Sequence, residues 1–381
     1  MSSAASAVVG MIGGGQLSRM THQAAIALGI DLHVLADGPE APAAAAGATP
    51  HLGGHEDLDA VLAFARQCDV VTLDHELTPA PILRALVDEG HVVRPHPDAA
   101  RFAQDKGVAR VAFAEAGLPV PAFILVDRGQ TAEVTEFAAE HGWPFVLKAP
   151  TGGYDGRGVE VIDDAAALER SELAANSGRW LVEAAVPIEI ELAVLVARRP
   201  SGETRLYPVV ETVQTDGICT ELITPARIPA DLADQAASLA RRIAEMTGAT
   251  GILAVEMFLT HDGELIVNEI ATRPHNSGHI TIESAATSQF ENHLRAVLDW
   301  PLGSTESIAP ASATVNVLGP LGSIDLAETV PRALEVEDAH LHLYRKVSRP
   351  GRKIGHVTAR ASTIEDARAA AHECVERLVG R

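Results

Sequence analysis

The chain has 381 residues, a length that favours two or three domains. Hydrophobic residues make up 47% of it and charged residues 21%, as is typical of a globular protein rather than a disordered chain. Acidic residues outnumber basic ones by 51 to 30, which gives a formal charge of -21. Because nucleic acids are bound through basic surfaces and often through stacked aromatic rings, this charge and the 4% of aromatic residues argue against such a partner.

The sequence predicts neither a membrane span nor a secretory signal. No apolar run reaches the roughly 20 residues that cross a bilayer, and no Lys or Arg precedes the apolar stretch at the N-terminus. The cysteines Cys68, Cys219 and Cys374 stand alone, without a CxxC pair. The simplest interpretation is a reduced, cytoplasmic protein without a membrane partner.

Short apolar runs alternate with helical segments in the first hundred residues. We expect strands at 7–12, 31–36, 69–73 and 91–93, and helices near 16–29, 56–66 and 78–88. The Ala- and Pro-rich stretch 38–50 has neither period and is expected to be a loop. Alternation of this kind is typical of parallel βαβ units with right-handed crossovers, so the region has an α/β pattern.

The pattern becomes mixed after a predicted helix at 97–117, which favours an α+β arrangement. Strands are expected at 122–126, 145–148, 158–162, 180–184 and 188–198, with two short helices among them. A helix at 231–247 precedes a hairpin of strands 252–259 and 264–270, for which Asp262-Gly263 is a good turn signal. The remaining elements are a helix at 281–299, short strands at 314–318, 341–344 and 354–358, and a final helix at 363–378.

Gly13, Gly14 and Gly15 lie between the first strand and the first helix. Such a turn lets backbone N–H groups and the positive helix end bind an anion, most often a phosphate. Ser18 stands where a dinucleotide fingerprint has its third glycine, although Asp37 ends the second strand as a ribose-binding acid would. We therefore expect phosphate binding without a nicotinamide cofactor, and a tight turn without a ligand is the alternative.

Four glycines fall within residues 151–158, between the strand that ends at Lys148 and the next strand. Glycine is conformationally free, so a mobile hairpin tip is one interpretation. Lys148 before the loop and Arg157 inside it favour a second one, in which the loop is a lid over nucleotide phosphates.

Two carboxylates, Glu256 and Glu269, lie on opposite strands of the predicted hairpin, each among apolar neighbours. Buried carboxylates need a partner, and hard oxygen ligands suit magnesium that bridges nucleotide phosphates. Arg273 and His275 follow at once and can balance the charge. Solvated, outward-facing side chains are the alternative.

Glu183 and Glu191 mark a second contact region. Residues 183–186 could offer backbone groups to an adenine, and Glu191 could accept both ribose hydroxyls. The strand periodicity leaves open that both are ordinary outward-facing residues.

Four stretches of the sequence stand out together: GGGQLSRM (13–20), TGGYDGRG (151–158), NEIATRPHNSGH (268–279) and RPGRKIGH (349–356). They resemble the ATP-grasp superfamily and, within it, the 5-(carboxyamino)imidazole ribonucleotide synthases of purine biosynthesis. They occur in the order found in that family and span nearly the whole chain. The resemblance implies a combined α/β and α+β fold: a Rossmann-like domain at 1–100, an ATP-grasp domain at 101–302 with a lid at about 120–186, and a small β-rich domain at 303–381.

The resemblance also implies a reaction. ATP, bicarbonate and 5-aminoimidazole ribonucleotide would give the N-carboxylated product, ADP and phosphate through carboxyphosphate, with Mg²⁺ or Mn²⁺ as cofactor. It implies a homodimer and a product passed to a downstream mutase. The alternatives are a formate-dependent glycinamide ribonucleotide formyltransferase, whose first stretch is similar, an NAD-dependent oxidoreductase, and a nucleotide-binding protein without activity.

The resemblance assigns roles to individual residues. The ATP contacts are Lys106, Lys148, Gly153, Tyr154, Asp155, Gly156, Arg157, Gly158, Val159, Glu183, Ala184, Ala185, Val186, Glu191, Gln214, Asn268 and Glu269. The ribonucleotide contacts are Gly14, Gly15, Gln16, Leu17, Glu76, Tyr154, Asp155, Arg157, Asn276, Lys346, Arg349, Arg352 and Lys353.

The metal ligands implied are Glu256 and Glu269, and the catalytic residues are Arg273, Lys148 and Tyr154. Arg273 would stabilise bicarbonate and the developing carboxyphosphate. Two positions depart from the family pattern: Gln214 stands where many relatives carry His, and His75 before Glu76 where an aromatic residue is more common. The roles of Gln214 and Glu76 therefore stay open.

Overall fold

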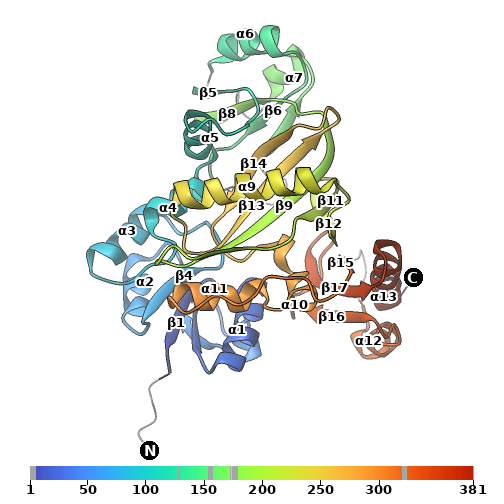
Figure 1. Cartoon of the computed structure of the whole chain (residues 1–381). Helices are drawn as coiled ribbons and strands as arrows, with labels where there is room; N and C mark the ends of the chain where they lie inside the picture. The colour runs from blue at the N-terminus through green and yellow to red at the C-terminus, as the bar shows by residue number, and fades with distance from the viewer. Residues whose placement is uncertain are drawn as a thin grey trace, which may run out of the picture.

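The structure is a computed structural model that describes residues 6–127, 129–152, 158–171, 173, 179–319 and 324–380. Gly153, Tyr154, Asp155, Gly156 and Arg157, to which the sequence assigns ligand contacts, lie outside the described residues. Three sheets organise the rest, with four, nine and four strands. In Figure 1 the N-terminal sheet lies at the lower left, the C-terminal strands at the lower right and the third sheet at the top.

The N-terminal sheet is parallel and has the order β3-β2-β1-β4. Its strands are β1 (Val8–Ile12), β2 (Asp31–Ala36), β3 (Thr49–Leu52) and β4 (Val70–Leu73), and its helices are α1 (Gln16–Leu28), α2 (Leu58–Ala65) and α3 (Ala80–Asp88). The predicted α/β pattern is confirmed.

Two predictions in this sheet are wrong. The expected loop at 38–50 contains a short 3₁₀ helix (Ala44–Ala46) and the start of β3, an edge strand whose exposed residues give no apolar period. The strand expected at 91–93 is a single bridge between Val71 and Val93, because Val93 alone is buried in that stretch.

Two predicted helices are each divided by a capping residue. The helix expected at 97–117 is α4 (Pro97–Gln104) and α5 (Lys106–Glu115), because extended Asp105 accepts a hydrogen bond from the N–H of Val108 and begins a new helix. The helix expected at 281–299 is α10 (Thr281–Ser284) and α11 (Gln289–Val297), with Ser288 as the cap. Apolar periodicity continues across such caps, so it does not reveal the break.

The third sheet, at the top of Figure 1, is antiparallel and has the order β5-β8-β6-β7. It consists of β5 (Phe123–Asp127), β6 (Phe145–Lys148), β7 (Val159–Ile162) and β8 (Arg179–Ala184), covered by α6 (Thr131–His141) and α7 (Ala165–Arg170). Its own core includes Phe137, Phe145 and Trp180. The sheet therefore packs as a separate layer above the rest of the molecule (Figure 1).

The large sheet joins the centre of the chain to its C-terminal part. Its order is β14-β13-β9-β11-β12-β15-β17-β16, with β10 on β9, and its pairs are antiparallel. The strands are β9 (Ile188–Arg198), β10 (Thr204–Leu206), β11 (Val210–Thr215), β12 (Ile218–Thr224), β13 (Gly251–Thr260), β14 (Leu265–Ala271), β15 (Ala311–Leu318), β16 (Ala339–Leu343) and β17 (Lys353–Ala361). The helices are α9 (Ala230–Thr247), α12 (Leu326–Ala333) and α13 (Ile364–Val379).

The hairpin predicted in this sheet is confirmed, since β13 and β14 pair with Glu256 opposite Glu269. Strands β10 to β12 were not predicted. Their buried acids conceal the apolar pattern: Glu211 forms an ion pair with Arg227, and Glu221 forms one with Arg368 at 2.7 Å.

Helix α11 packs between the N-terminal sheet and the large sheet. Phe290 and Leu294 belong to the core under β1 and β2. His293 accepts a hydrogen bond from the N–H of Ile252 at Nδ1 (3.1 Å) and contacts Thr72 Oγ1 through Nε2 (2.9 Å). Burial lowers the pKa of His293 to about 3, so the ring is neutral and its Nε2–H donates to Thr72.

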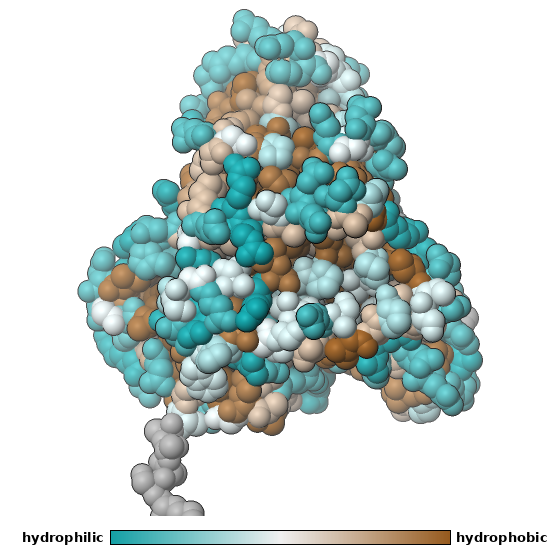
Figure 2. Space-filling view, in the orientation of Figure 1, coloured by the Kyte–Doolittle hydropathy of each residue, from teal (hydrophilic) through white to brown (hydrophobic). Residues whose placement is uncertain are grey.

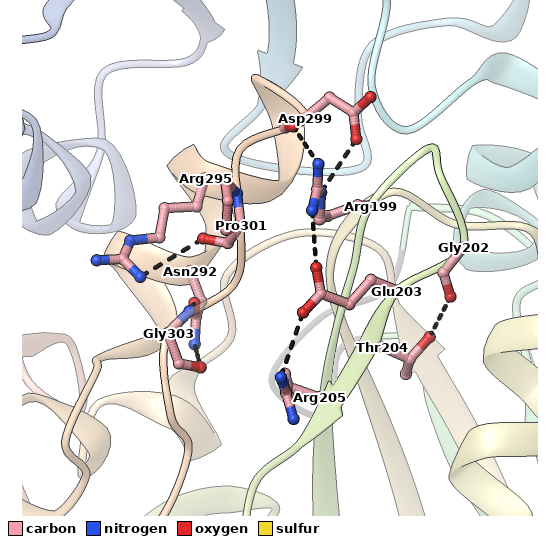
Figure 3. A network of polar contacts seen from close by, with 10 residues as sticks. All are labelled: Arg199, Gly202, Glu203, Thr204, Arg205, Asn292, Arg295, Asp299, Pro301 and Gly303. Carbon is pink, nitrogen blue, oxygen red and sulfur yellow. Dashed lines mark hydrogen bonds and ion pairs between the residues drawn. The ribbon is translucent and has the colours of Figure 1, made fainter.

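The end of α11 is tied to the β9–β10 hairpin by a polar network (Figure 3). Arg199 lies between Asp299, at 3.1 Å, and Glu203, at 2.7 Å. Asn292 Oδ1 accepts the N–H of Gly303 at 2.8 Å, which fixes the chain that leaves the helix. These contacts connect the end of α11 to the β9–β10 hairpin and to the segment that follows the helix.

Hydrophilic residues cover most of the face shown in Figure 2, and smaller apolar patches are interspersed among them. Among the residues described, no helix combines the length and the apolar character that a membrane crossing requires.

Candidate functional site

Glu256 and Glu269 lie side by side on the β13–β14 hairpin, as the sequence predicts. Lys106, the first residue of α5, forms an ion pair with Glu269. Burial opposes ionisation of Glu269, but the charges of Lys106 and Lys148 outweigh it and lower the pKa of this carboxyl. Burial, together with the charges of Glu269 and Glu191, raises the pKa of Glu256 to about 8. One carboxylate thus has a cation partner, while the other is held protonated at neutral pH.

The cations around Glu256 compensate its charge only in part. Nε2 of His275 lies 3.5 Å from Glu256 Oε1, and the charges of Lys106 and, to a lesser extent, Lys353 lower the pKa of this carboxyl without offsetting burial and the neighbouring acids. Gln214 hydrogen-bonds Glu191, a third acid of this group, whose pKa is raised by burial. Three carboxyl groups therefore gather on β9, β13 and β14.

A buried ion-pair cluster lies next to these acids. Glu183 is 2% exposed, with Lys148 Nζ at 2.7 Å and Arg110 Nε at 2.5 Å from its carboxylate. Lys148 also donates to Asn268 Oδ1 at 3.0 Å, and Arg110 donates to the carbonyl oxygens of Val267 and Asn268, each at 2.7 Å. The cluster fastens β6, β8 and β14 to α5, so the outward-facing alternative for Glu183 is wrong.

Arg110 was not among the site residues predicted from the sequence. A signal for it exists, because Lys106, Arg110 and Phe113 stand at helical spacing and line one pocket with Lys148, Asn268 and Glu269. Residues that the sequence assigned to ATP also border this region. Gly158 precedes β7, and Val159 pairs with Lys148. Ala184 ends β8, and Ala185 and Val186 lie in the connection to β9.

Arg273 and Glu76 meet at the edge of the acidic group. Their side chains form an ion pair of 2.9 Å, and Arg273 also donates to the carbonyl of Pro274. Gln104 fixes the Glu76 loop by donating to the carbonyl oxygens of Glu76 and Thr78 at 3.3 and 2.7 Å. The N-terminal region therefore contributes a carboxylate that orients Arg273.

The glycine turn is partly occupied by a side chain of the protein itself. Asp74, at the end of β4, accepts hydrogen bonds from the N–H groups of Gly15 (2.7 Å) and Ser18 (3.1 Å). A Cβ at Gly15 would lie 2.6 Å from the Asp74 carboxylate, which explains the glycine. Two backbone donors of the predicted phosphate site thus already have an anionic acceptor, and Gln16 and Leu17 lie between them at the start of α1.

The C-terminal segment brings one lysine to this turn and another to the acidic hairpin. Lys346 binds Gln16 Oε1, and Lys353 begins β17 close enough to influence Glu256. Arg349 and Arg352 are exposed on the turn before β17, where Arg352 donates to the Val347 carbonyl at 3.2 Å.

Asn276 lies in a short 3₁₀ helix after β14. Its amide oxygen and nitrogen are buried without a hydrogen-bond partner among the described residues. An amide in this state is suited to a polar ligand.

Three domain families match consecutive parts of the chain. The ribonucleotide synthetase preATP-grasp domain matches residues 6–104, and the ATP-grasp domain matches residues 111–290. The phosphoribosylaminoimidazole carboxylase C-terminal domain matches residues 312–370.

A curated relative covers almost the whole chain. The N5-carboxyaminoimidazole ribonucleotide synthase of Mycobacterium tuberculosis (strain ATCC 25618 / H37Rv) is 47% identical over 378 residues, which are 96% of this chain and 87% of the relative. The chain belongs to the N5-carboxyaminoimidazole ribonucleotide synthase family. The resemblance and the fold class predicted from the sequence are confirmed.

Solved structures of the synthase family agree with this assignment. The synthase from Aspergillus clavatus in complex with ADP and 5-aminoimidazole ribonucleotide has a TM-score of 0.89 at 33% identity, covering 98% of each chain. The synthetase from Thermotoga maritima has a TM-score of 0.86 at 37% identity, covering 97% of this chain and 98% of that one.

Proposed function

We propose that the protein carboxylates the exocyclic amine of 5-aminoimidazole ribonucleotide, using ATP and bicarbonate and releasing ADP and phosphate. The observation that carries this proposal is the convergence of Glu256 and Glu269 with Lys106 and Lys148 in one site of a synthase-family chain. The Aspergillus clavatus relative bound to ADP and 5-aminoimidazole ribonucleotide supports the same pair of ligands.

The donor set fits Mg²⁺. Carboxylate oxygens are its preferred protein ligands, and the raised pKa of Glu256 is the mark of acids with too little compensating charge. Glu256 and Glu269 would hold the ion, and Mn²⁺ suits the same ligands. When bound, the ion neutralises charge on the nucleotide phosphates.

The residues of the chain bind and orient the reactants of phosphoryl transfer. Bicarbonate is a poor electrophile, so one of its oxygens first attacks the γ-phosphorus of ATP, the bond to ADP breaks, and carboxyphosphate forms. Lys106 and Lys148 are placed to bind phosphate oxygens. Arg273, held by Glu76 at 2.9 Å, is placed to bind bicarbonate and the carboxyphosphate made from it.

The second step forms the carbon–nitrogen bond. The amine nitrogen attacks the carboxyl carbon of carboxyphosphate, or CO₂ released from it, and loses a proton as phosphate departs. Gly14 to Leu17, Asn276, Lys346, Arg349, Arg352 and Lys353 are the residues assigned to the ribonucleotide. Because Asp74 already accepts two backbone donors of the turn, we assign most of the phosphate's charge balance to the lysines and arginines.

The test is ADP release by the full chain with 5-aminoimidazole ribonucleotide and either bicarbonate or formate. The proposal expects rapid release with bicarbonate and only background with formate. Release with formate and glycinamide ribonucleotide instead would support the formyltransferase. The homodimer, the transfer of product to a downstream mutase and the cytoplasmic location stay predictions.

A further inference from the structure

A group of potential metal ligands lies outside the residues assigned to ATP, bicarbonate and the ribonucleotide. Glu283 on α10, His342 on β16 and His356 on β17 each offer one ligand atom, and these atoms lie within 4.8 Å of one another. The three elements lie side by side in Figure 1, where β16 pairs with β17 and α10 contacts β17. We call these three side chains the Glu-His-His group.

His356 is fully buried, Glu283 and His342 are largely buried, and the polar atoms of the group are incompletely paired. His342 Nε2 contacts Glu283 Oε1 at 2.7 Å, and the rings of His342 and His356 stack at 4.4 Å. His356 is 0% exposed, and its Nε2 has no hydrogen-bond partner among the described residues; the same holds for Glu283 Oε2. A buried polar atom left without a hydrogen-bond partner destabilises the fold, so its retention needs a reason.

Tyr344 holds His356 in an orientation suited to a metal ligand. The Tyr344 hydroxyl lies 2.6 Å from His356 Nδ1. If Nδ1–H donates to this oxygen, the lone pair of the unpartnered Nε2 is left available to a metal ion. Metal-binding histidines commonly use their second nitrogen in this way. Burial lowers the pKa of His356 well below its ordinary value, so the ring is neutral, as a ligand must be.

A third histidine adjoins the group. His279 is 0% exposed, neither of its ring nitrogens has a partner among the described residues, and its ring lies 5.0 Å from that of His356. His279 is therefore close enough to supply a further contact, directly or through a water molecule.

We propose that Glu283, His342 and His356 bind one divalent transition-metal ion, with Zn²⁺ as the best-fitting member of that class. Two imidazoles and one carboxylate form a known zinc ligand set and a poor magnesium site, because Mg²⁺ favours oxygen ligands. Zinc bonds of about 2.0–2.1 Å place neighbouring ligand atoms roughly 3.3 Å apart, so small side-chain rotations would complete the site.

The position of the ion suggests a structural role. It would link α10 to the β16–β17 pair, and the segment between these strands carries Lys346 and ends at Lys353. The ion would thereby hold the cationic segment against the ribonucleotide site. Its loss should lower stability and ribonucleotide affinity more than ATP affinity.

The test is Zn²⁺ titration of the chelator-treated, full-length protein in excess Mg²⁺, with a chromophoric zinc indicator as competitor. The proposal expects one tight equivalent, and His342→Ala and Glu283→Gln should each weaken binding at least tenfold. Glu269→Gln should retain it, which separates the group from the ATP site. His33→Ala is the matched control, because His33 and His51 form another histidine pair at 3.0 Å.

Two further measurements use the wild-type protein, so they do not depend on the folding of a variant. Zinc should raise its melting temperature, and X-ray absorption of the zinc-loaded protein should show two imidazole ligands and oxygen. The proposal is overturned if the wild type binds no zinc tightly, if the absorption spectrum shows sulfur or only oxygen ligands, or if folded His342→Ala and Glu283→Gln bind zinc like the wild type.

Discussion

The candidate site has an acidic end on β9, β13 and β14 and a second end at the glycine turn, and charge is balanced differently at the two. At the acidic end, Glu191, Glu256 and Glu269 gather around few cations, and the pKa of Glu256 rises to about 8. At the glycine-turn end, the protein provides its own anion, since Asp74 accepts the N–H groups of Gly15 and Ser18.

This difference indicates how each end recognises its ligand. The proposal requires an external cation at the acidic end, so we expect nucleotide binding there to depend on Mg²⁺ and on Lys106 and Lys148. At the turn end, two backbone donors already bind a carboxylate of the protein. Specificity for a phosphate must then come from side chains that reach it from elsewhere, above all Lys346, which binds Gln16.

The largest effect should come from removing charge at the acidic end. Glu269→Gln takes away a carboxylate that pairs with Lys106, and we expect kcat to fall by about 100-fold or more because charge stabilisation worth several kcal/mol is lost. ADP release measures this. Glu264→Gln, at the exposed turn of the same hairpin, is the control and should be unchanged. A Glu269→Gln enzyme within threefold of the wild type would contradict the metal assignment.

The pH dependence of metal binding tests the same end. Without metal, the raised pKa of Glu256 keeps its carboxyl protonated below about pH 8, and the ion must displace that proton. Affinity for Mn²⁺, measured by electron paramagnetic resonance, should therefore rise by up to about tenfold per pH unit between pH 6 and 8 and then level off. Glu256→Gln should abolish this slope. A flat wild-type profile would show that Glu256 is already ionised.

A smaller effect is expected at the glycine-turn end, where we assign the C-terminal arginines and lysines to the ribonucleotide. Arg352→Ala should raise the KM for the ribonucleotide by roughly tenfold, the value of one charge-assisted hydrogen bond, and leave the KM for ATP nearly unchanged. Steady-state kinetics with each substrate varied in turn separates the two. Arg241→Ala, exposed on α9, is the control. Equal changes in both KM values would argue against a ribonucleotide contact for Arg352.

The smallest effect, on stability, is expected from removing the Asp74 carboxylate. Asp74→Ala removes the acceptor for Gly15 and Ser18 and should lower the free energy of unfolding by about 1–2 kcal/mol, as loss of a helix cap does. Denaturant unfolding measures it, with Asp59→Ala on the exposed first turn of α2 for comparison. If the variant is as stable as the wild type, water replaces Asp74 as the acceptor without loss of stability. The N–H groups of Gly15 and Ser18 would then not depend on Asp74.

The parts of the site that sequence predicted are those encoded by local patterns. The β13–β14 hairpin consists of two apolar runs joined by an Asp-Gly turn, so the proximity of Glu256 and Glu269 followed from strand pairing. The breaks at Asp105 and Ser288 did not, because a cap depends on one side chain and leaves the apolar period intact.

Contacts between distant segments were beyond the reach of such patterns. Asp74 meets the glycine turn across 59 residues, and Arg110 meets Asn268 across 158. Strands β11 and β12 of the large sheet could not be predicted for the same reason. Their buried Glu211 and Glu221 form ion pairs with arginines elsewhere in the chain.

The central claim is that the acidic end activates bicarbonate by phosphorylating it. Bicarbonate labelled with ¹⁸O, mixed rapidly with enzyme, ATP and 5-aminoimidazole ribonucleotide, tests it most directly. Because a bicarbonate oxygen attacks the γ-phosphorus and leaves with the phosphate, the account predicts one labelled oxygen in each inorganic phosphate formed. Unlabelled phosphate, released while labelled bicarbonate remains in solution, would contradict it.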